Sequence, residues 1–485
     1  LSMDEVFKRM NYTHSAAGEE FLYYTLRTPA TDKEELKQRE SVIDYFREDA
    51  DERVSFQVIF AKLGNVGKFS IYDYLDYLAA LGKRSNFPHY LALVLVVLAV
   101  LFMFADIPLG LLALVCVLIY NNISYFKIKS EIDPYITSFS YIFRLLDAVS
   151  QIGKRKVDVL SDERMALKQY SSAMTGFKTG SFLLMSSGRM SGSGNPLDML
   201  VDFLRMSLHL DLIKFNQMLG EVRKHTDEID GMLTIVGKIE TMIVIGEYRE
   251  SLEQYCLPEF SEKLMIKAKE LYHPLLINPV KNDIFTEKNV LITGSNASGK
   301  STFLKTVALN ALLAQTIHTV LASSYMASMF RICSSMALRD DVQGGDSYYM
   351  VEIKALKRIL DELKVEGMPV LCFVDEVLRG TNTVERIAAS AQILRSMDNN
   401  RCICFAATHD IELTHMLEKD YSNYHFSEEI ANDDIFFSYK IREGRATTRN
   451  AIRLLGIMGY DDGIIQKAEH TAEEFLKCGK WTALD

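Results

Sequence analysis

One short stretch of the chain combines the residue types that bind nucleotide phosphates. Residues 294–302 read Gly-Ser-Asn-Ala-Ser-Gly-Lys-Ser-Thr and fit the pattern G-x-x-x-x-G-K-S/T. In such a loop the glycines let the backbone turn tightly, so that its N–H groups point at phosphate oxygens. Lys300 would contact the β- and γ-phosphates, and Ser301 would bind Mg²⁺ through its hydroxyl. The other predicted phosphate-site positions are Gly294, Ser295, Asn296, Ala297, Ser298, Gly299 and Thr302.

The flanking sequence predicts the strand and the helix that this loop requires. Residues 289–293 form a short apolar run typical of a buried strand, and residues 303–313 have the pattern of a helix. The N-terminus of that helix would add the positive end of its dipole to the phosphate site. A Gly/Ser-rich turn that fits the pattern by chance is the alternative. The strand, the helix and two carboxylates farther along the chain argue against it.

Those carboxylates, Asp375 and Glu376, follow a second apolar run at residues 369–374. A carboxylate at a strand end can hold Mg²⁺ through its water shell, which is the role predicted for Asp375. Glu376 is placed to orient or deprotonate the attacking water. Alone, such a pair is also typical of a helix N-cap or an exposed acidic pair. Downstream of a phosphate loop it indicates nucleotide hydrolysis.

Two further polar residues are candidates for the same site. His409 follows a third apolar run at residues 401–407, where it would sense the γ-phosphate or position water. A single histidine is more often structural, but three strand ends meet here, and α/β sheets bind ligands at such an edge. Ser347 lies at or near the start of a helix, behind Gly344-Gly345. An anion-binding helix end and a simple N-capped loop explain it equally well.

Composition and patterning indicate two main domains. The chain has 485 residues and a formal net charge of −10, so a nucleic-acid contact would need a local basic patch. Seven cysteines without a C-x-x-C pair indicate reduced thiols in a cytosolic environment. Residues up to about 270 have helical patterns. From residue 271 on, strands alternate with helices, which predicts an α/β domain.

An apolar stretch interrupts the helical half. Residues 87–105 and 107–126 carry no formal charge and are separated by Asp106 in a turn. Each run is close to the ~20 residues that cross a bilayer. Basic residues flank the pair on both sides, as the positive-inside rule requires, at Lys83, Arg84, Lys127 and Lys129. The sequence therefore predicts a two-span hairpin in the cell membrane with the α/β domain in the cytoplasm. A buried hairpin in a soluble core is the alternative.

The motifs together resemble the MutS family of ATPases. The resemblance covers residues 271–475 well and the helical half more loosely. Its pieces in the C-terminal half are Thr293–Thr302, Phe330–Ile332, Gly344–Glu352, Val374–Thr383 and Thr408–Thr414, with His273–Leu275 and Asn282–Asp283 before the loop and Phe436–Lys440 near the end. Its pieces in the helical half are Met3–Phe7, Thr13, Gly18, Arg39, Gly237–Glu240 and Tyr255–Pro258.

The resemblance implies a fold of the α plus α/β type, in which a helical core and lever domain precedes a P-loop NTPase domain of the ABC-like class. The expected domains are 1–86 and 127–270 for the helical core, 87–126 for the transmembrane hairpin and 271–485 for the ATPase domain. The family implies ATP and Mg²⁺ as cofactors and a homodimer with composite ATP sites. In that dimer Ser347 would reach the partner's γ-phosphate, and Arg379–Thr383 would lie at the dimer contact. The predicted catalytic residues are Lys300, Glu376 and His409, and the metal ligands are Ser301 and Asp375.

The family function would be an ATP-driven dimeric clamp on mismatched or branched DNA. In this sequence no mismatch-reading domain precedes the helical core, the long DNA clamp is absent or reduced, and the apolar hairpin lies in its neighbourhood. A membrane-anchored ATPase switch without a DNA role is therefore a second hypothesis. Short basic runs at Lys154–Lys156 and Arg223–Lys224 are candidates for a DNA contact, although such runs are usually solvated. A transporter ATPase is disfavoured, because two spans make no pathway and no Leu-Ser-Gly-Gly-Gln signature is present.

Overall fold

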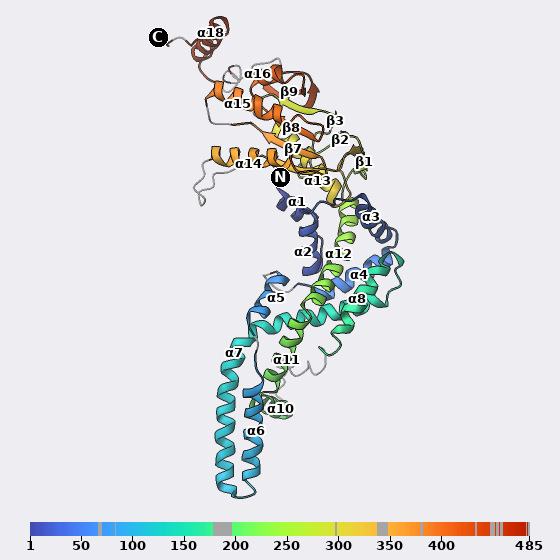
Figure 1. Ribbon diagram of the computed structural model, residues 1–485, viewed down its shortest axis with the longest axis vertical. Helices are drawn as coiled ribbons and strands as arrows, with labels where there is room; N and C mark the ends of the chain where they lie inside the picture. The colour runs from blue at the N-terminus through green and yellow to red at the C-terminus, as the bar shows by residue number, and fades with distance from the viewer. Residues whose placement is uncertain are drawn as a thin grey trace. The chain divides into compact units, whose positions relative to one another are not determined.

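The computed structural model describes two compact units (Figure 1). The α/β unit contains residues 1–9, 25–39 and 249–485, and the helical unit contains residues 10–24 and 40–248. The boundary expected near residue 270 lies inside the α/β unit, because the short strand β1 (Glu259–Phe260) already pairs with a strand of that unit. Residues outside the description are 66–69, 83, 178–195, 296–297, 337–347, 379–381, 432–433, 447–451, 453–454, 456–458, 482 and 484–485.

A six-stranded sheet with the order β10-β9-β4-β8-β7-β6 organises the α/β unit. Its neighbouring strands run parallel, except that β10 is antiparallel to β9. The central strands are buried along their whole length, as expected for a parallel sheet that is covered on both faces. The strands are β4 (Asn289–Thr293), β6 (Arg331–Ser335), β7 (Val370–Asp375), β8 (Cys402–Ala407), β9 (Tyr421–Ala431) and β10 (Asp434–Glu443).

Helices cover the two faces of this sheet. On one face α13 (Lys300–Thr316) packs with Phe373 and Phe405, and a second sheet of order β1-β5-β2-β3 closes the same core. On the other face α14 (Tyr348–Glu362) and α15 (Thr383–Ser396) pack with Cys372 and Cys404. The alternation of side chains along β7 and β8 thus builds two separate cores. The remaining elements are α1 (Met3–Met10), α3 (Lys33–Glu48), β2 (Ile266–Leu271), β3 (Asn282–Thr286), β5 (Ser324–Ala327), α16 (Ile411–Met416) and α18 (Asp462–Cys478).

The helical unit is built around α7 (Ile107–Lys154), a single helix of 48 residues. Its C-terminal half packs against α4 (Ala50–Leu63) and α8 (Ser161–Ala173). Phe139, which α7 contributes, is fully buried and meets Phe215 edge-on. The other helices are α2 (Ala16–Thr25), α5 (Ile71–Ala80), α6 (Phe87–Phe102), α10 (Pro196–Ser207), α11 (Leu210–Lys224) and α12 (Thr226–Glu250), with a 3₁₀ turn at Asp158–Leu160.

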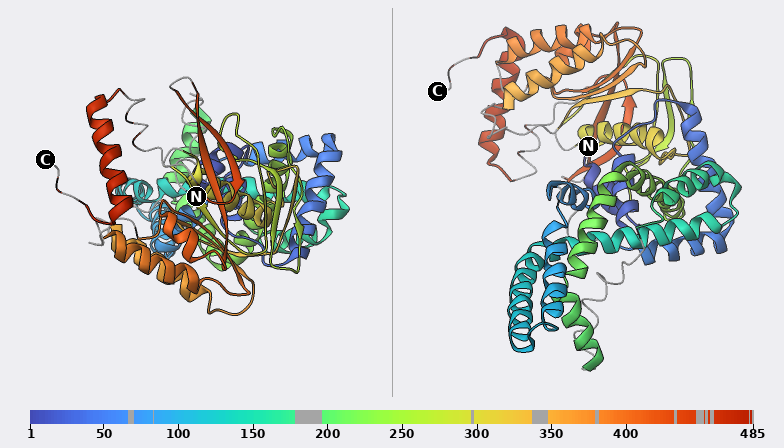
Figure 2. Two further views of the ribbon diagram at one scale, coloured as in Figure 1. Left: turned by 90° about the horizontal axis from the view of Figure 1, so that it is seen from above. Right: turned by 60° about the horizontal axis from the view of Figure 1, so that its bottom comes forward.

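The apolar stretch forms α6 and the first part of α7, which pack side by side (Figures 1 and 2). Within the described residues only Ile107–Asp133 is long and apolar enough to cross a membrane, with a mean hydropathy of 1.9 and 11% of its most apolar window buried. The 16 residues of α6 reach about 24 Å, less than the ~30 Å of a bilayer core. One helix of spanning length is therefore present, and a second span is not shown.

Two details of the apolar pair differ from the sequence-based expectations. The second apolar helix does not end at Phe126, since α7 continues without a break to Lys154. A hairpin buried in a soluble core does not fit either, because large apolar side chains point outward. Leu101 on α6 is 56% exposed and Leu112 on α7 is 61% exposed.

Candidate active site

The register of the parallel strands brings three strand ends to one edge of the sheet. Ala407 on β8 lies opposite Ile292 on β4 and, on its other side, opposite Asp375 on β7. The chain leaves all three strands at this level. The described residues of the 294–302 segment, the Asp375-Glu376 pair and His409 therefore converge, as the sequence predicts for a ligand site at the carboxyl edge.

Two glycines shape the phosphate-loop sequence. Gly294 has a φ of +143° and Gly299 a φ of +106°, which L-residues rarely adopt. A Cβ on Gly294 would lie 2.8 Å from the carbonyl oxygen of Phe426, so a side chain has no room there. Gly299 immediately precedes α13, whose N-terminal N–H groups face the loop. The local geometry is the one that a phosphate-binding loop needs.

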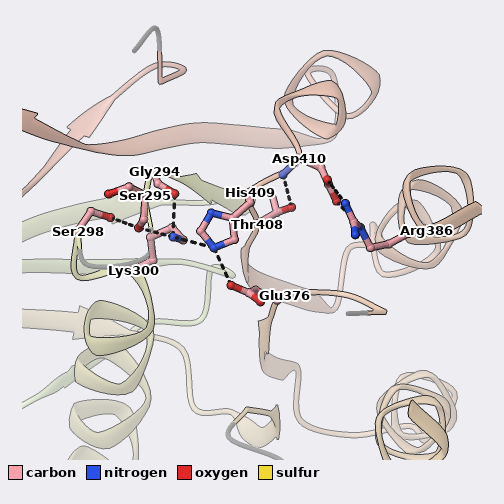
Figure 3. A network of polar contacts seen from close by, with 9 residues as sticks. All are labelled: Gly294, Ser295, Ser298, Lys300, Glu376, Arg386, Thr408, His409 and Asp410. Carbon is pink, nitrogen blue, oxygen red and sulfur yellow. Dashed lines mark hydrogen bonds and ion pairs between the residues drawn. The ribbon is translucent and has the colours of Figure 1, made fainter. Parts of the chain in front are cut away.

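Lys300 lies inside this loop rather than on its surface. Its side chain is buried, and its Nζ donates to the carbonyl oxygens of Gly294 (2.8 Å) and Ser295 (2.7 Å) (Figure 3). Ser298, also buried, donates from Oγ to the Ser295 carbonyl at 2.8 Å. These bonds hold the ammonium group at the centre of the loop, 3.4 Å from Nε2 of His409. A positive charge is thereby fixed where phosphate oxygens would bind.

Glu376 and His409 are in direct contact at this edge of the sheet. His409 Nε2 lies 2.7 Å from Glu376 Oε1, and Figure 3 shows the imidazole between Glu376 and Lys300. Glu376 has a φ of +57°, and its backbone N–H donates to the carbonyl of Ala407 at 3.0 Å. This strained backbone turns the carboxylate toward the β8 end. A protonated Nε2 donates to the carboxylate and cannot then accept from Lys300, so the shorter contact defines the pair.

The sequence analysis missed an ion pair that holds the residue next to His409. Arg386 on α15 donates from Nε (3.0 Å) and Nη2 (2.6 Å) to the two carboxylate oxygens of Asp410, the residue after His409 (Figure 3). The Asp410 N–H donates in turn to Thr408 Oγ1 at 3.0 Å. The segment that carries His409 is thus held on both sides. No spacing rule links Arg386 to Asp410, since the two residues meet only through the fold.

A second contact missed by the sequence analysis anchors the turn after Glu376. Glu352 on α14 is buried and accepts a hydrogen bond at Oε1 from the backbone N–H of Leu378 (2.5 Å). Leu378 has a φ of +57°, the second left-handed residue in this turn. Glu352 belongs to the Gly344–Glu352 stretch of the resemblance, where only Ser347 had been given a role.

The residues present fit a divalent cation bound with a nucleotide. Asp375 Oδ1 is buried and has no hydrogen-bond partner among the described residues, which is unusual for a carboxylate oxygen. Ser301 lies exposed in the first turn of α13. The described part of the chain has no group of three or more His, Cys, Asp or Glu side chains that could hold a metal ion. Mg²⁺ needs none here, since it is usually held by one or two protein ligands, phosphates and waters.

A cavity of about 370 Å³ lies beside the loop and was not predicted. Ile277, 89% exposed, and Tyr439 line it with mostly apolar surface, and Gly299 and Thr302 connect it to the phosphate loop. Burial lowers the pKa of His273 at its edge to about 4, so this imidazole is neutral at physiological pH. The cavity suits a flat, uncharged group such as a nucleobase. The apolar residues Leu276 and Ile277, just upstream of β3, are the sequence signal that could have indicated this cavity.

Some predicted site residues lie outside the described part of the chain. These are Asn296, Ala297, Ser347 and the first three residues of the 379–383 segment. Their roles remain predictions. The remaining predicted residues of the loop, together with Asp375, Glu376 and His409, lie at one edge of the sheet.

Comparison with known proteins finds a match for part of the α/β unit. Residues 290–476 match the family model of MutS domain V. The chain is 32% identical over 275 residues to the DNA mismatch repair protein MutS of Thermotoga petrophila, which covers 54% of this chain and 34% of that protein. The same protein of Thermotoga maritima is also 32% identical over 275 residues. The chain thus spans about a third of the length of the curated relatives that it matches.

Proposed function

We propose that this protein, whose residues 290–476 are a MutS domain V ATPase domain, is a membrane-attached, Mg²⁺-dependent ATPase switch that works as a dimer. The observation that carries the proposal is the meeting of Lys300, Glu376 and His409 at one sheet edge. The cation can bind phosphate oxygens, the carboxylate can orient the attacking water and the imidazole can position that carboxylate, which together suit nucleotide hydrolysis.

In the proposed mechanism the loop N–H groups and Lys300 bind the phosphates of ATP, and the cavity next to Gly299 takes the base. Ser301 and Asp375 would hold Mg²⁺, which neutralises charge on the β- and γ-phosphates. Glu376 accepts a proton from the attacking water as the oxygen bonds to the γ-phosphorus and the bond to ADP breaks. His409 donates to Glu376 and so fixes the direction of its carboxylate.

The dimer is the second part of the proposal. In the family-like arrangement Ser347 of one protomer completes the γ-phosphate site of its partner. A mixed dimer of a Ser347→Ala protomer with a Glu376→Gln protomer tests this. If Ser347 acts in trans, one site is intact and the other carries both defects, so about half of the activity remains. If it acts within its own protomer, each site carries one defect and hydrolysis stops.

Membrane attachment is the third part of the proposal, and the exposed apolar surface of α6 and α7 supports it. In water these side chains would form a large exposed apolar patch, which soluble monomers rarely carry. Basic residues flank the pair on both sides in the sequence, with Arg84 before it and Lys127 and Lys129 after it. Two spans in the cell membrane with a cytoplasmic ATPase domain would follow from this pattern. The shorter α6 would then need local thinning of the bilayer.

DNA binding is a second candidate function, favoured by the match to DNA mismatch repair proteins. Of the predicted basic run, Lys154 and Lys156 are exposed, whereas Arg155 pairs with Glu52 at 3.1 Å. Two exposed lysines make a small patch, so any DNA contact from this run would be weak and salt-dependent.

The deciding experiment measures ATP hydrolysis in nanodiscs without DNA and with homoduplex, mismatched or branched DNA, at two salt concentrations. Stimulation by one DNA form that weakens with salt would assign a membrane-attached DNA clamp. Hydrolysis indifferent to every DNA would leave the ATPase switch and remove the DNA role. No hydrolysis above that of the Lys300→Ala variant under any condition would contradict the ATPase proposal.

A further inference from the structure

Helix α10 (Pro196–Ser207) exposes apolar side chains and buries a charged one, which is unusual for a helix in water. Five of its large apolar side chains are exposed, whereas Arg205 is only 6% exposed and pairs with Asp202 at 2.8 Å. The outward-facing residues, each between 42% and 69% exposed, are Met199, Leu200, Val201, Phe203 and Leu204.

This distribution is the reverse of what water favours. A surface helix of a soluble protein turns its apolar stripe inward and its charges outward, because apolar exposure and charge burial both cost free energy. In a bilayer the preference inverts. Ionisable residues there face the protein interior and pair with one another, as Asp202 and Arg205 do.

The surface that α10 turns inward is polar, and it docks on α7. Asn121 donates from Nδ2 to the Ser207 carbonyl at 3.0 Å, and Asn122 donates to Ser207 Oγ at 3.0 Å. His209, in a left-handed turn just after α10, contacts the Asn121 carbonyl through Nε2 at 2.9 Å. Asn121 and Ser207 are at most 1% exposed. Polar side chains thus hold the helices together from within, as they do between helices in a membrane.

Next to this contact, the carboxylate of Asp211 on α11 contacts two side chains of α7. Tyr125 donates to Asp211 Oδ2 at 2.7 Å, and Lys129 Nζ lies 3.5 Å from the same oxygen. Asp211 is 1% exposed. The junction of α7 with α10 and α11 is therefore charged and hydrogen-bonded, whereas the outward surface of the arm formed by α6, α7 and α10 is apolar.

The apolar face of α10 is also continuous with a larger one. α10 packs against α7, and Figure 2 (right) shows it next to the α6–α7 pair. Leu98 on α6 is 54% exposed and Ile119 on α7 is 56% exposed, so apolar side chains are exposed on these two helices as they are on α10. Because Ile107–Asp133 has the length of a membrane span, the same medium would surround all three helices.

We infer that α10 is a third lipid-contacting helix, which places Leu200, Phe203 and their apolar neighbours against acyl chains beside the α6–α7 pair. The inference rests on the proposed membrane attachment and extends it. The membrane-embedded part of the protein is then a three-helix arm with a polar interior. At 12 residues, about 18 Å, α10 enters the bilayer without crossing it.

Tryptophan reporters in the full chain test this, because the chain has one tryptophan, Trp481. In a Trp481→Phe background, single tryptophans replace Phe203 (α10), Leu112 (α7) or Met165 (α8). Met165, 65% exposed on the helical unit, is the matched water-facing control. The protein is reconstituted in phosphatidylcholine–phosphatidylglycerol nanodiscs. Fluorescence is quenched either by nitroxides on the acyl chains or by acrylamide in the buffer.

The expected result is that the Phe203→Trp and Leu112→Trp reporters are quenched by the lipid nitroxides and the Met165→Trp reporter by acrylamide. If Leu112→Trp alone is quenched by lipid and Phe203→Trp by acrylamide, α10 faces water and the inference is wrong, while the membrane attachment stands. If Phe203→Trp is protected from both quenchers, protein covers α10, and the inference is also wrong. If Leu112→Trp is not quenched by lipid, the proposed attachment itself fails.

Discussion

His409 Nε2 and Glu376 Oε1 are 2.7 Å apart, although 33 positions separate the two residues in the sequence. The parallel pairing of β7 with β8 makes this contact, since Asp375 and Ala407 are register partners and each strand ends at that level. The contact fixes one oxygen of the candidate base. Its other oxygen would be the one that meets the attacking water.

Replacing Glu376 with Gln removes the proton acceptor but keeps the size of the side chain. We expect ATP hydrolysis to fall by about 10²- to 10⁴-fold, the usual contribution of a general base, while ATP affinity changes little. Single-turnover hydrolysis and equilibrium binding of ATP measure the two effects separately. The matched control is Glu385→Gln, an exposed residue on α15, which should leave both unchanged. Normal hydrolysis by Glu376→Gln would assign the base elsewhere.

Lys300→Ala removes the buried ammonium group from the loop. Charge-assisted hydrogen bonds contribute roughly 1.5–3 kcal/mol each, so ATP affinity should fall by at least about tenfold. Isothermal titration with ATP measures this. Lys305→Ala, one and a half turns farther along α13, is the control for the loss of a positive charge on the same helix. Unchanged ATP affinity in the Lys300 variant would contradict the assignment of the phosphate loop.

Arg386 is bonded to Asp410, next to His409, and we expect it to act as a positioning residue. Arg386→Lys keeps the charge but loses the two-point contact with Asp410, and kcat should fall by roughly 10- to 100-fold. KM for ATP and the unfolding temperature should change little, because Lys300 and the loop are untouched. Arg395→Lys, 72% exposed on the same helix, is the control. An equal loss of kcat in both variants would argue against positioning.

The stability of the helical unit should depend on pH through Glu240 on α12. Burial raises the pKa of this carboxyl from about 4.5 to about 7, even though Ser15 and the backbone N–H of His14 donate to it. Between these pH values the folded protein keeps a proton that the unfolded chain has lost. The free energy of unfolding therefore falls as pH rises from about 4.5 to about 7 and levels off above it.

Urea unfolding of the full chain at several pH values, followed by a probe in the helical unit, measures this dependence. Glu240→Gln, which cannot titrate, should flatten the curve between pH 4.5 and 7. Glu250→Gln on the last turn of the same helix, which is exposed, should keep the slope of the parent. A parent protein whose stability rises over this interval would show that the carboxylate form is favoured at Glu240.

The local chemistry of this protein was predictable from its sequence. The loop of residues 294–302 is contiguous, so its pattern alone implies the tight turn, the helix N-terminus and the buried lysine. The strands before Asp375 and His409 were predictable as well, because a fully buried parallel strand is a short continuous apolar run.

Only the tertiary structure decided which distant residues meet. The Arg386–Asp410 pair, the Glu352 contact and the cavity beside Gly299 join elements whose sequence separation follows no period. The apolar stretch shows the same limit. Its composition predicted membrane contact, but the length of α6, the continuation of α7 and the outward face of α10 are visible only in the folded chain. The reason is physical: a residue's type limits which environments it tolerates, but the packing of all the elements decides which environment it receives.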